Sequence, residues 1–230
     1  MIADKLALVH QRIASACTSA GRPVQSVTLL VVSKTFAAEA VREAFGAGER
    51  RFGENHVQEA AHKIEALADL RAELEWHLIG PVQGNKTRLV AERFDWVHSV
   101  DRLKTAERLS AQRPAHLAPL AVCLQVNISG EATKAGFAPG EVAAAAHAVA
   151  ALPRLALRGL MAIPEPAVDF AAQRLPHRAL RALFDALRRD GLALDTLSMG
   201  MSADLEAAIA EGATLVRVGS AIFGDRPRPH

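Results

Sequence analysis

An alternation of short apolar runs with helical segments, repeated along the chain after Pro23, most constrains what this sequence can fold into. Several of the apolar runs are continuous rather than alternating, which is typical of parallel strands covered on both faces. Eight strand candidates occur, at residues 27–34, 50–55, 75–80, 95–100, 120–127, 155–163, 195–200 and 214–224. Eight strand–helix units predict an α/β fold of the (β/α)8 TIM-barrel type.

An open, doubly wound sheet is the alternative for such an alternation. Its usual mark, a GxGxxG phosphate loop after the first strand, does not occur in the sequence, so the barrel is favoured. The first residues, MIADKLALVHQRIASACTSAG, have helical spacing of apolar residues and predict an extra N-terminal helix that ends at Gly21-Arg22-Pro23. The Pro-rich segment 162–170 predicts a long loop, and residues 224–230 predict a frayed tail. No linker is found, so residues 1–230 are expected to form a single domain.

The composition argues against several classes of partner. The formal net charge is only +2 and no basic run is present, so there is no electrostatic reason to expect nucleic acid or an anionic membrane. No apolar run approaches the ~18 residues of a membrane span, and the N-terminal segment lacks the apolar core of a signal peptide. Cys17 and Cys123 lie far apart without CxxC spacing, as in proteins with reduced thiols. We therefore expect a cytoplasmic protein.

The run LLVVSKTF, residues 29–36, places a lysine at the end of an apolar strand. Burial of an ammonium group is costly, and lysine is almost never fully buried without a partner. Two interpretations remain open: Lys34 extends to solvent, or its amine lies in a pocket where it takes part in binding. Because the active sites of TIM barrels lie at the C-terminal ends of the strands, the second interpretation predicts further binding residues at those ends.

Two loops rich in Gly and Ser follow the last two strands, where this fold recurrently binds phosphate. In SMGMS, Ser202 is placed to cap the helix ADLEAAIAEG, and helix N-termini have free N–H groups that suit a phosphate. In RVGSAIFG, Gly219 and Ser220 allow another backbone segment to approach closely. Ordinary capping and an ordinary strand glycine are the structural alternatives. The occurrence of both loops at this place favours a phosphate site.

A phosphate site opposite a recessed lysine is the arrangement that holds pyridoxal phosphate as a Schiff base. Arg217 lies two residues before Gly219. The alternation of side chains along a strand places Arg217 toward the barrel mouth, with Val216 and Val218 facing the helices. A surface salt bridge is the alternative role for this arginine.

Other candidate motifs are weaker. GPVQGNKT, residues 80–87, is similar to a phosphate-binding P-loop, but Asn85 precedes its lysine where glycine is required, so nucleotide hydrolysis is not expected. The nine histidines show no metal-ligand spacing, and no metal site is predicted. His56 and His62 are expected at solvated helix positions. His77 either lines the barrel mouth or is a hydrogen-bonded residue at a strand end.

At these motifs the sequence resembles the pyridoxal phosphate homeostasis protein family. The resemblance extends from Lys5 to Gly224 and rests on VSKT, FGENHVQE, WHLIGPVQGNK, RGLMAIP, LSMGMSADLEAAI and VRVGSAIFG. It implies a barrel like the N-terminal domain of alanine racemase. It also implies a protein that holds pyridoxal 5′-phosphate as a Schiff base and serves intracellular pyridoxal phosphate homeostasis without substantial catalysis.

The resemblance also assigns individual residues. The residues that it places at the cofactor are Lys34, Asn55, Ser202, Arg217, Gly219 and Ser220. Lys34, in VSKT, forms the Schiff base, and the serines and Gly219 lie at the phosphate. Arg217 matches the arginine that faces the pyridine nitrogen in alanine racemase, and Asn55, in GEN, lies near the cofactor.

Two departures from the family pattern neighbour the expected cofactor mouth. His56 stands where a tyrosine is usual, and Pro81-Val82 replaces a His/Leu-type pair. They put secondary contacts in question but not the Schiff base.

A carrier and an enzyme remain as alternatives: a non-catalytic pyridoxal phosphate buffer, or a pyridoxal phosphate-dependent racemase or decarboxylase. Two-base alanine racemases pair the lysine with a tyrosine from a second domain and a partner chain, whereas this sequence has no tyrosine and ends soon after the eighth strand. A two-base mechanism needs an acid or base on each face of the substrate, and His77 is the only other candidate. We expect the carrier, as a monomer or weak dimer, with pyridoxal phosphate-dependent apo-enzymes as transient clients.

Overall fold

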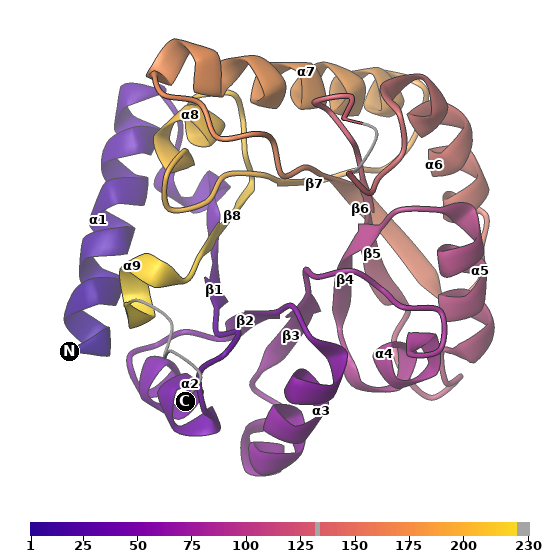
Figure 1. Ribbon diagram of the computed structural model, residues 1–230, viewed down its shortest axis with the longest axis horizontal. Helices are drawn as coiled ribbons and strands as arrows, with labels where there is room; N and C mark the ends of the chain where they lie inside the picture. Colours follow the sequence, from indigo (N-terminus) through magenta and orange to yellow (C-terminus); the bar gives the residue numbers. More distant parts are fainter. Residues whose placement is uncertain (132–133, 225–230) are drawn as a thin grey trace.

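The computed structural model describes residues 1–131 and 134–224, and within them eight parallel strands form a closed barrel (Figure 1). Each strand pairs with its neighbours in sequence, and β8 closes the ring against β1. The strands are β1 (Thr28–Val32), β2 (Arg51–Glu54), β3 (Glu75–Leu78), β4 (Trp96–Val100), β5 (Leu120–Gln125), β6 (Leu155–Met161), β7 (Thr196–Ser198) and β8 (Leu215–Val218). The closed order confirms the predicted TIM barrel and excludes the open, doubly wound sheet.

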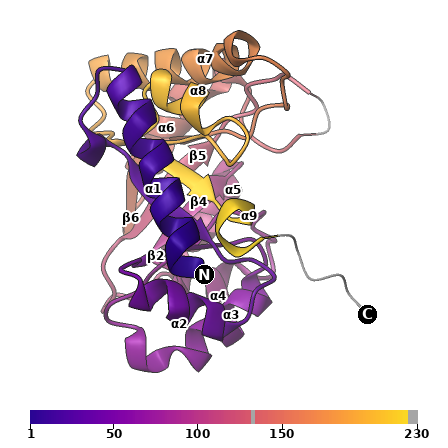
Figure 2. The ribbon, with the colours of Figure 1, turned by 90° about the vertical axis from the view of Figure 1, so that its left-hand side faces the viewer.

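Helices surround the ring of strands. The α-helices are α1 (Ile2–Ser19), α2 (Ala38–Gly46), α3 (Val57–Ala66), α4 (Thr87–Arg93), α5 (Leu103–Gln112), α6 (Val142–Ala150), α7 (Phe170–Arg189), α8 (Leu205–Ala210) and α9 (Ser220–Phe223), and the 3-10 turns are η1 (Val24–Ser26), η2 (Ala68–Leu70) and η3 (Pro139–Glu141). Helix α1 precedes the first strand and packs against α2, α8 and α9 (Figure 2). This arrangement confirms the predicted N-terminal helix.

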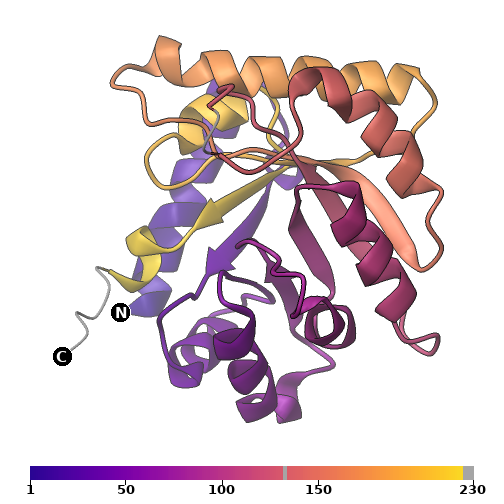
Figure 3. The same ribbon diagram turned by 45° about the vertical axis from the view of Figure 1, so that its right-hand side comes forward.

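The strands are buried by the helices outside and by side chains inside, which explains their continuous apolar runs. In β8, Val216 and Val218 belong to the hydrophobic core, and Arg217 between them is also buried. Leu30 of β1 lies opposite Arg217 in the register, and Figure 3 shows β1 and β8 side by side with their C-terminal ends at the same end of the barrel. Residues that follow these two strands therefore meet at one mouth.

Strand ends differ from the sequence prediction at two places that matter for the site. The first predicted strand includes Lys34, but β1 ends at Val32 and Lys34 lies in a turn. The last predicted strand covers 214–224, but β8 ends at Val218 and α9 follows directly. At the end of β8 the chain passes so close to β1 that a Cβ on residue 219 would lie 2.8 Å from the carbonyl oxygen of Val32. This close approach requires glycine at position 219.

Other expectations are met where the structure describes them. Residues 162–169 form the long loop between β6 and α7, and the predicted frayed tail falls almost wholly on residues 225–230, outside the described residues. Cys17 and Cys123 are buried and free, as expected for reduced thiols. Burial raises the pKa of the Cys123 thiol to about 12, so its thiolate is not available for reaction. Among the helices in the described ranges, none is both long enough and apolar enough to cross a membrane.

Candidate functional site

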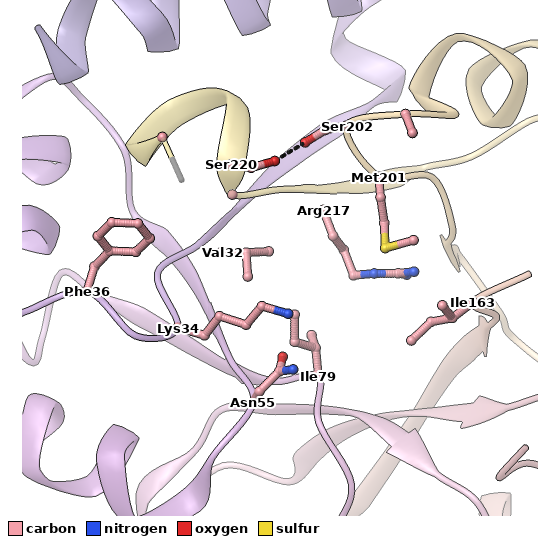
Figure 4. Close-up of a pocket in the computed structure, with 13 residues that line it drawn as sticks. Val32, Lys34, Phe36, Asn55, Ile79, Ile163, Met201, Ser202, Arg217 and Ser220 are labelled. Atoms are coloured by element: carbon pink, nitrogen blue, oxygen red, sulfur yellow. Dashed lines mark hydrogen bonds between the residues drawn. The ribbon is translucent and has the colours of Figure 1, made fainter. Parts of the chain in front are cut away.

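A cavity of about 620 Å³ opens at the C-terminal mouth of the barrel (Figure 4). Its volume lies within the range of small-molecule sites. The residues that line it are Val32, Lys34, Phe36, Asn55, Ile79, Ile163, Met201, Ser202, Ala203, Arg217, Gly219, Ser220 and Gly224. All six residues that the sequence analysis places at a cofactor are among them. The chain thus brings together residues from the ends of β1, β2, β7 and β8, and Figure 4 shows Lys34, Asn55 and Arg217 pointing into a shared space.

Hydrogen bonds from backbone N–H groups hold the turn that contains Lys34. The amide N–H of Phe36 donates to the carbonyl oxygen of Ser33 over 3.1 Å, which closes a turn around Lys34 and Thr35. Thr35 has a φ of 69°, a left-handed conformation that costs a β-branched residue free energy. Its N–H donates to Glu59 Oε1 over 2.6 Å, and this bond to a carboxylate offsets part of that cost. The base of the Lys34 side chain is therefore fixed, and Lys34 itself is half-buried.

A buried ion pair lies against this turn and stabilises it. Lys63 Nζ donates to Glu54 Oε1 over 2.6 Å, to the carbonyl oxygen of Ser33 over 2.9 Å and to Glu59 Oε1 over 3.3 Å. The Ser33 hydroxyl also donates to Glu54 Oε1, over 2.6 Å. Only 4% of the Lys63 side chain and 0% of the Glu54 side chain is exposed. Burial raises the pKa of Glu54, and the charge and hydrogen bond of Lys63 oppose that shift.

Lys63 is not among the residues predicted from the sequence, although the sequence carries a signal for it. Val57, Ala60 and Ile64 form the buried face of α3, and Lys63 falls on the same face. A lysine on the apolar stripe of an amphipathic helix requires a buried partner. Glu54, at the end of the neighbouring strand, is that partner.

The loops after β7 and β8 form the opposite side of the cavity. The Ser220 hydroxyl donates to the Ser202 hydroxyl over 3.4 Å, so the two serines lie next to each other (Figure 4). The prediction that Ser202 caps the following helix is wrong, because α8 begins only at Leu205, after Asp204. Asp204 instead accepts from the Met201 N–H over 2.7 Å and orders the loop. Ser202 is therefore available to the cavity rather than to the helix.

Arg217 reaches the cavity from inside the barrel. Its Nη1 donates to the carbonyl oxygen and the hydroxyl of Ser198, each over 2.7 Å, and its Nη2 donates to the carbonyl oxygen of Ala162 over 2.9 Å. Burial lowers the pKa of Arg217 to about 10, which leaves the guanidinium protonated at neutral pH. Arg217 is only 3% exposed, so the alternative of a surface salt bridge is wrong.

The singled-out histidines do not belong to the cavity. His77 is fully buried and hydrogen-bonded to His98 and Glu75, so of the two expectations the hydrogen-bonded one is confirmed. His62 is exposed on α3, as expected, and His56 is exposed just before that helix begins. The departures at His56 and Pro81-Val82 lie outside the set of described residues that line the cavity.

The lining has the chemistry for one kind of ligand. An amine, two neighbouring hydroxyls, an amide and a guanidinium surround apolar walls. Hydroxyls next to a bare glycine backbone suit a phosphate, and the amine suits an aldehyde. A flat aromatic aldehyde that carries a phosphate fits this combination. Over residues 1–131 and 134–224 no three His, Cys, Asp or Glu side chains are grouped so that they could hold a metal ion.

Residues 7–227 match the family model described as "Alanine racemase, N-terminal domain". The chain is 61% identical over 225 residues to the pyridoxal phosphate homeostasis protein of Pseudomonas aeruginosa, a match that covers 98% of this chain and 96% of that protein. It is 53% identical over 226 residues to the protein of the same name from Escherichia coli K12, covering 98% and 97% of the two chains.

Among solved structures, the chain is similar to PipY of Synechococcus elongatus, which was solved with PLP (pyridoxal phosphate) bound. The TM-score is 0.85 at 39% sequence identity, and the match covers 97% of this chain and 100% of PipY.

Proposed function

Because the chain belongs to the pyridoxal phosphate homeostasis protein family, we propose that it binds pyridoxal 5′-phosphate in the mouth cavity and serves to buffer or deliver this cofactor. The observation that carries the proposal is the convergence of Lys34, the two serines and Arg217 on one cavity. The similarity to a protein solved with PLP bound supports the same conclusion.

Each lining residue has a distinct part in this proposal. The cofactor supplies an aldehyde that condenses reversibly with amines. Lys34 supplies the amine that holds it covalently, and its fixed turn places that amine in the mouth. Ser202, Ser220 and the backbone at Gly219 bind the phosphate, and Asn55 contacts the cofactor from the end of β2.

Arg217 sets the electronic state of the cofactor ring. A guanidinium can only donate hydrogen bonds, so a ring nitrogen that faces it must be unprotonated. An unprotonated ring is a poor electron sink and supports carbanion chemistry weakly. This property is compatible with a carrier, and since alanine racemase has the matching arginine, the choice between a carrier and a racemase rests on the other lining residues.

The cavity favours a carrier over the alternative of an amino-acid racemase or decarboxylase. Among its described lining residues, Lys34 and Arg217 are the ionisable ones. Arg217 is protonated at neutral pH and Lys34 holds the cofactor, so no second acid or base faces a substrate from the other side. As a carrier, residues 1–230 act as a single domain in the cytoplasm, as a monomer or weak dimer, and transfer the cofactor to pyridoxal phosphate-dependent apo-enzymes.

Reductive trapping tests the proposed function. Borohydride treatment of the protein with pyridoxal phosphate, followed by peptide mass spectrometry, should place the reduced adduct on Lys34. Lys34→Ala should abolish the adduct, whereas Lys104→Ala, at an exposed position on α5, should leave it unchanged. Pyridoxal without its phosphate should bind about ten- to a hundredfold more weakly, because a hydrogen bond to a charged group contributes about 1.5–3 kcal/mol. An adduct on Lys86 or Lys134, or equal affinity for both compounds, would contradict the assigned site.

Incubation with L-alanine tests whether the protein is a carrier or an enzyme. Chiral chromatography should detect no D-alanine above the level produced by free pyridoxal phosphate. Turnover in the range of ordinary enzymes, about 1–1,000 per second, would identify a racemase instead.

A further inference from the structure

A continuous chain of hydrogen bonds runs through the inside of the barrel to Arg217. From Arg217 Nη1 it passes to the Ser198 hydroxyl over 2.7 Å, and from that hydroxyl to His98 Nδ1 over 2.7 Å. It continues from His98 Nε2 to His77 Nδ1 and from His77 Nε2 to Glu75 Oε1, each over 2.8 Å. This series of hydrogen bonds joins residues of four strands, β8, β7, β4 and β3, and links the cavity to a carboxylate at the start of β3.

The carboxylate end of this hydrogen-bond chain, together with the neutral state of the two imidazoles, fixes the direction of every bond in it. An ionised carboxylate can only accept, so His77 carries its proton on Nε2 and donates it to Glu75 Oε1. A neutral His77 accepts at Nδ1, so His98 carries its proton on Nε2 and donates it there. A neutral His98 accepts at Nδ1 from the Ser198 hydroxyl, whose oxygen accepts from Arg217. The hydrogen bond from His77 lowers the pKa of Glu75 against the effect of its partial burial.

The surroundings hold both imidazoles in the neutral form. His77 and His98 are both fully buried, and the ring of Trp96 stacks on His77 with centroids 5.3 Å apart. The charged groups that act on the pair are Glu75, Asp95, Arg51 and Arg217. Burial lowers the pKa of both histidines, and the Arg217 charge lowers that of His98 further. A proton on His98 would place a second positive charge next to Arg217 in the barrel interior.

These hydrogen bonds also determine which N–H groups of Arg217 are left for the cavity. Both N–H groups of Nη1 donate to Ser198, and one N–H of Nη2 donates to Ala162. Of the five N–H groups of a guanidinium, two then remain for a ligand, one on Nη2 and one on Nε. The carbonyl oxygens of Ser198 and Ala162 hold the guanidinium in this orientation, and the Ser198 hydroxyl, whose own proton is directed to His98, adds a third acceptor.

We propose that Ser198, His98 and His77 are positioning residues for Arg217, and that both histidines are held as the neutral Nε2–H tautomer. Their effect on the cofactor rests on the proposed function, whereas the tautomers follow from the protein alone. The proposal thus assigns a role to buried polar residues that do not line the cavity.

Imidazole nitrogen NMR of the ¹⁵N-histidine-labelled protein, without cofactor, tests the tautomers directly. At pH 7 both buried rings should show a protonated Nε2 and an unprotonated Nδ1. A protonated Nδ1 on either ring, or an imidazolium at pH 7, would overturn the proposal. This measurement needs no substitution and no bound ligand, so it decides even if a variant fails to fold.

Substitutions at Ser198 test the positioning role. Ser198→Ala should remove the hydrogen bond to His98 Nδ1, which shifts the resonance of that nitrogen, and should weaken pyridoxal phosphate binding by about three- to tenfold, the effect of one hydrogen bond. Ser198→Thr, which keeps the hydroxyl, should restore both properties. Ser99→Ala is the matched control, because this buried serine of β4 donates to the Gly80 carbonyl oxygen over 2.5 Å and not to the chain.

The outcomes separate this proposal from the proposed function. An unchanged His98 Nδ1 resonance in Ser198→Ala would refute the directed chain, and a shifted resonance with unchanged affinity would refute the positioning of Arg217. If the wild-type protein did not bind pyridoxal phosphate at all, both the proposed function and the positioning of Arg217 for that cofactor would be wrong. The NMR measurement would still decide the histidine tautomers.

Discussion

Replacing Lys63 with methionine is expected to lower the free energy of unfolding by about 3–5 kcal/mol, the usual cost of removing one partner of a buried ion pair. The substitution keeps the length of the side chain but leaves the Glu54 carboxylate in the barrel wall without its positive partner. The Ser33 carbonyl oxygen also loses its Lys63 donor. Urea denaturation of the wild-type and variant proteins at pH 7 measures the difference.

Two comparisons make the Lys63 result specific. Lys104→Met, the same substitution at an exposed position of α5, should change stability by no more than about 0.5 kcal/mol. The double variant Lys63→Met/Glu54→Gln should recover part of the loss, because it also removes the unpaired carboxylate. If Lys63→Met were as stable as Lys104→Met, the buried pair would not stabilise the protein.

The same substitution is expected to weaken pyridoxal phosphate binding even though Lys63 lies outside the cavity. Lys63 holds both the Ser33 carbonyl oxygen and the Glu59 carboxylate, and Glu59 in turn binds the Thr35 amide in the turn that carries Lys34. Loosening this turn raises the entropic cost of bringing the Lys34 amine to the cofactor. Fluorescence titration with pyridoxal phosphate measures the change.

Acid is expected to destabilise the protein well above the pH at which carboxylates titrate. His77 and His98 have lowered pKa values in the folded protein, whereas the unfolded chain takes up protons near pH 6.5. Above pH 6.5 both states are neutral and stability is unaffected. Below it, the unfolded state binds more protons, so each histidine costs about 1.4 kcal/mol per pH unit until its folded pKa is reached. Stability should therefore fall as the pH is lowered from 6.5 toward the folded pKa values of the two histidines.

Denaturation curves at pH 7, 6 and 5 measure this acid dependence. His98→Asn retains an acceptor near the Ser198 hydroxyl but cannot bind a proton, so its stability should fall about half as steeply with pH. His62→Gln, at an exposed position of α3, should keep the wild-type slope. Stability that is constant between pH 6.5 and 5 would show that the buried histidines accept protons in the folded state.

The sequence was sufficient for the fold because the fold depends on a repeated local pattern. Each strand of the barrel reads as an apolar run, and each helix reads as an amphipathic segment, so their alternation identifies the architecture without any knowledge of long-range contacts. The ends of the elements were less well predicted. Lys34 and Gly219 lie just beyond strands because of a turn and a close approach to Val32, and neither depends on hydrophobicity.

The members of the candidate site could be predicted for the same reason. In a parallel barrel, residues at the C-terminal ends of strands share one mouth whatever their separation in sequence. Lys34 and Ser220 are far apart in the chain, yet the register of β1 and β8 brings them to one cavity. Residue type and strand position therefore indicated the lining, whereas the expected helix cap by Ser202 failed because α8 begins only at Leu205.

The sequence by itself determined the order of strands and helices, the mouth at which polar residues gather, and the identity of the lysine there. The tertiary structure alone decided what supports those residues. Lys63 meets Glu54 only when α3 folds back onto the end of β2, and His98 meets Ser198 only after strands distant in sequence have closed into a ring. Hydrophobic periodicity specifies which face of an element is buried, but the partner of a buried polar group is set by the register across the barrel, which no local pattern encodes.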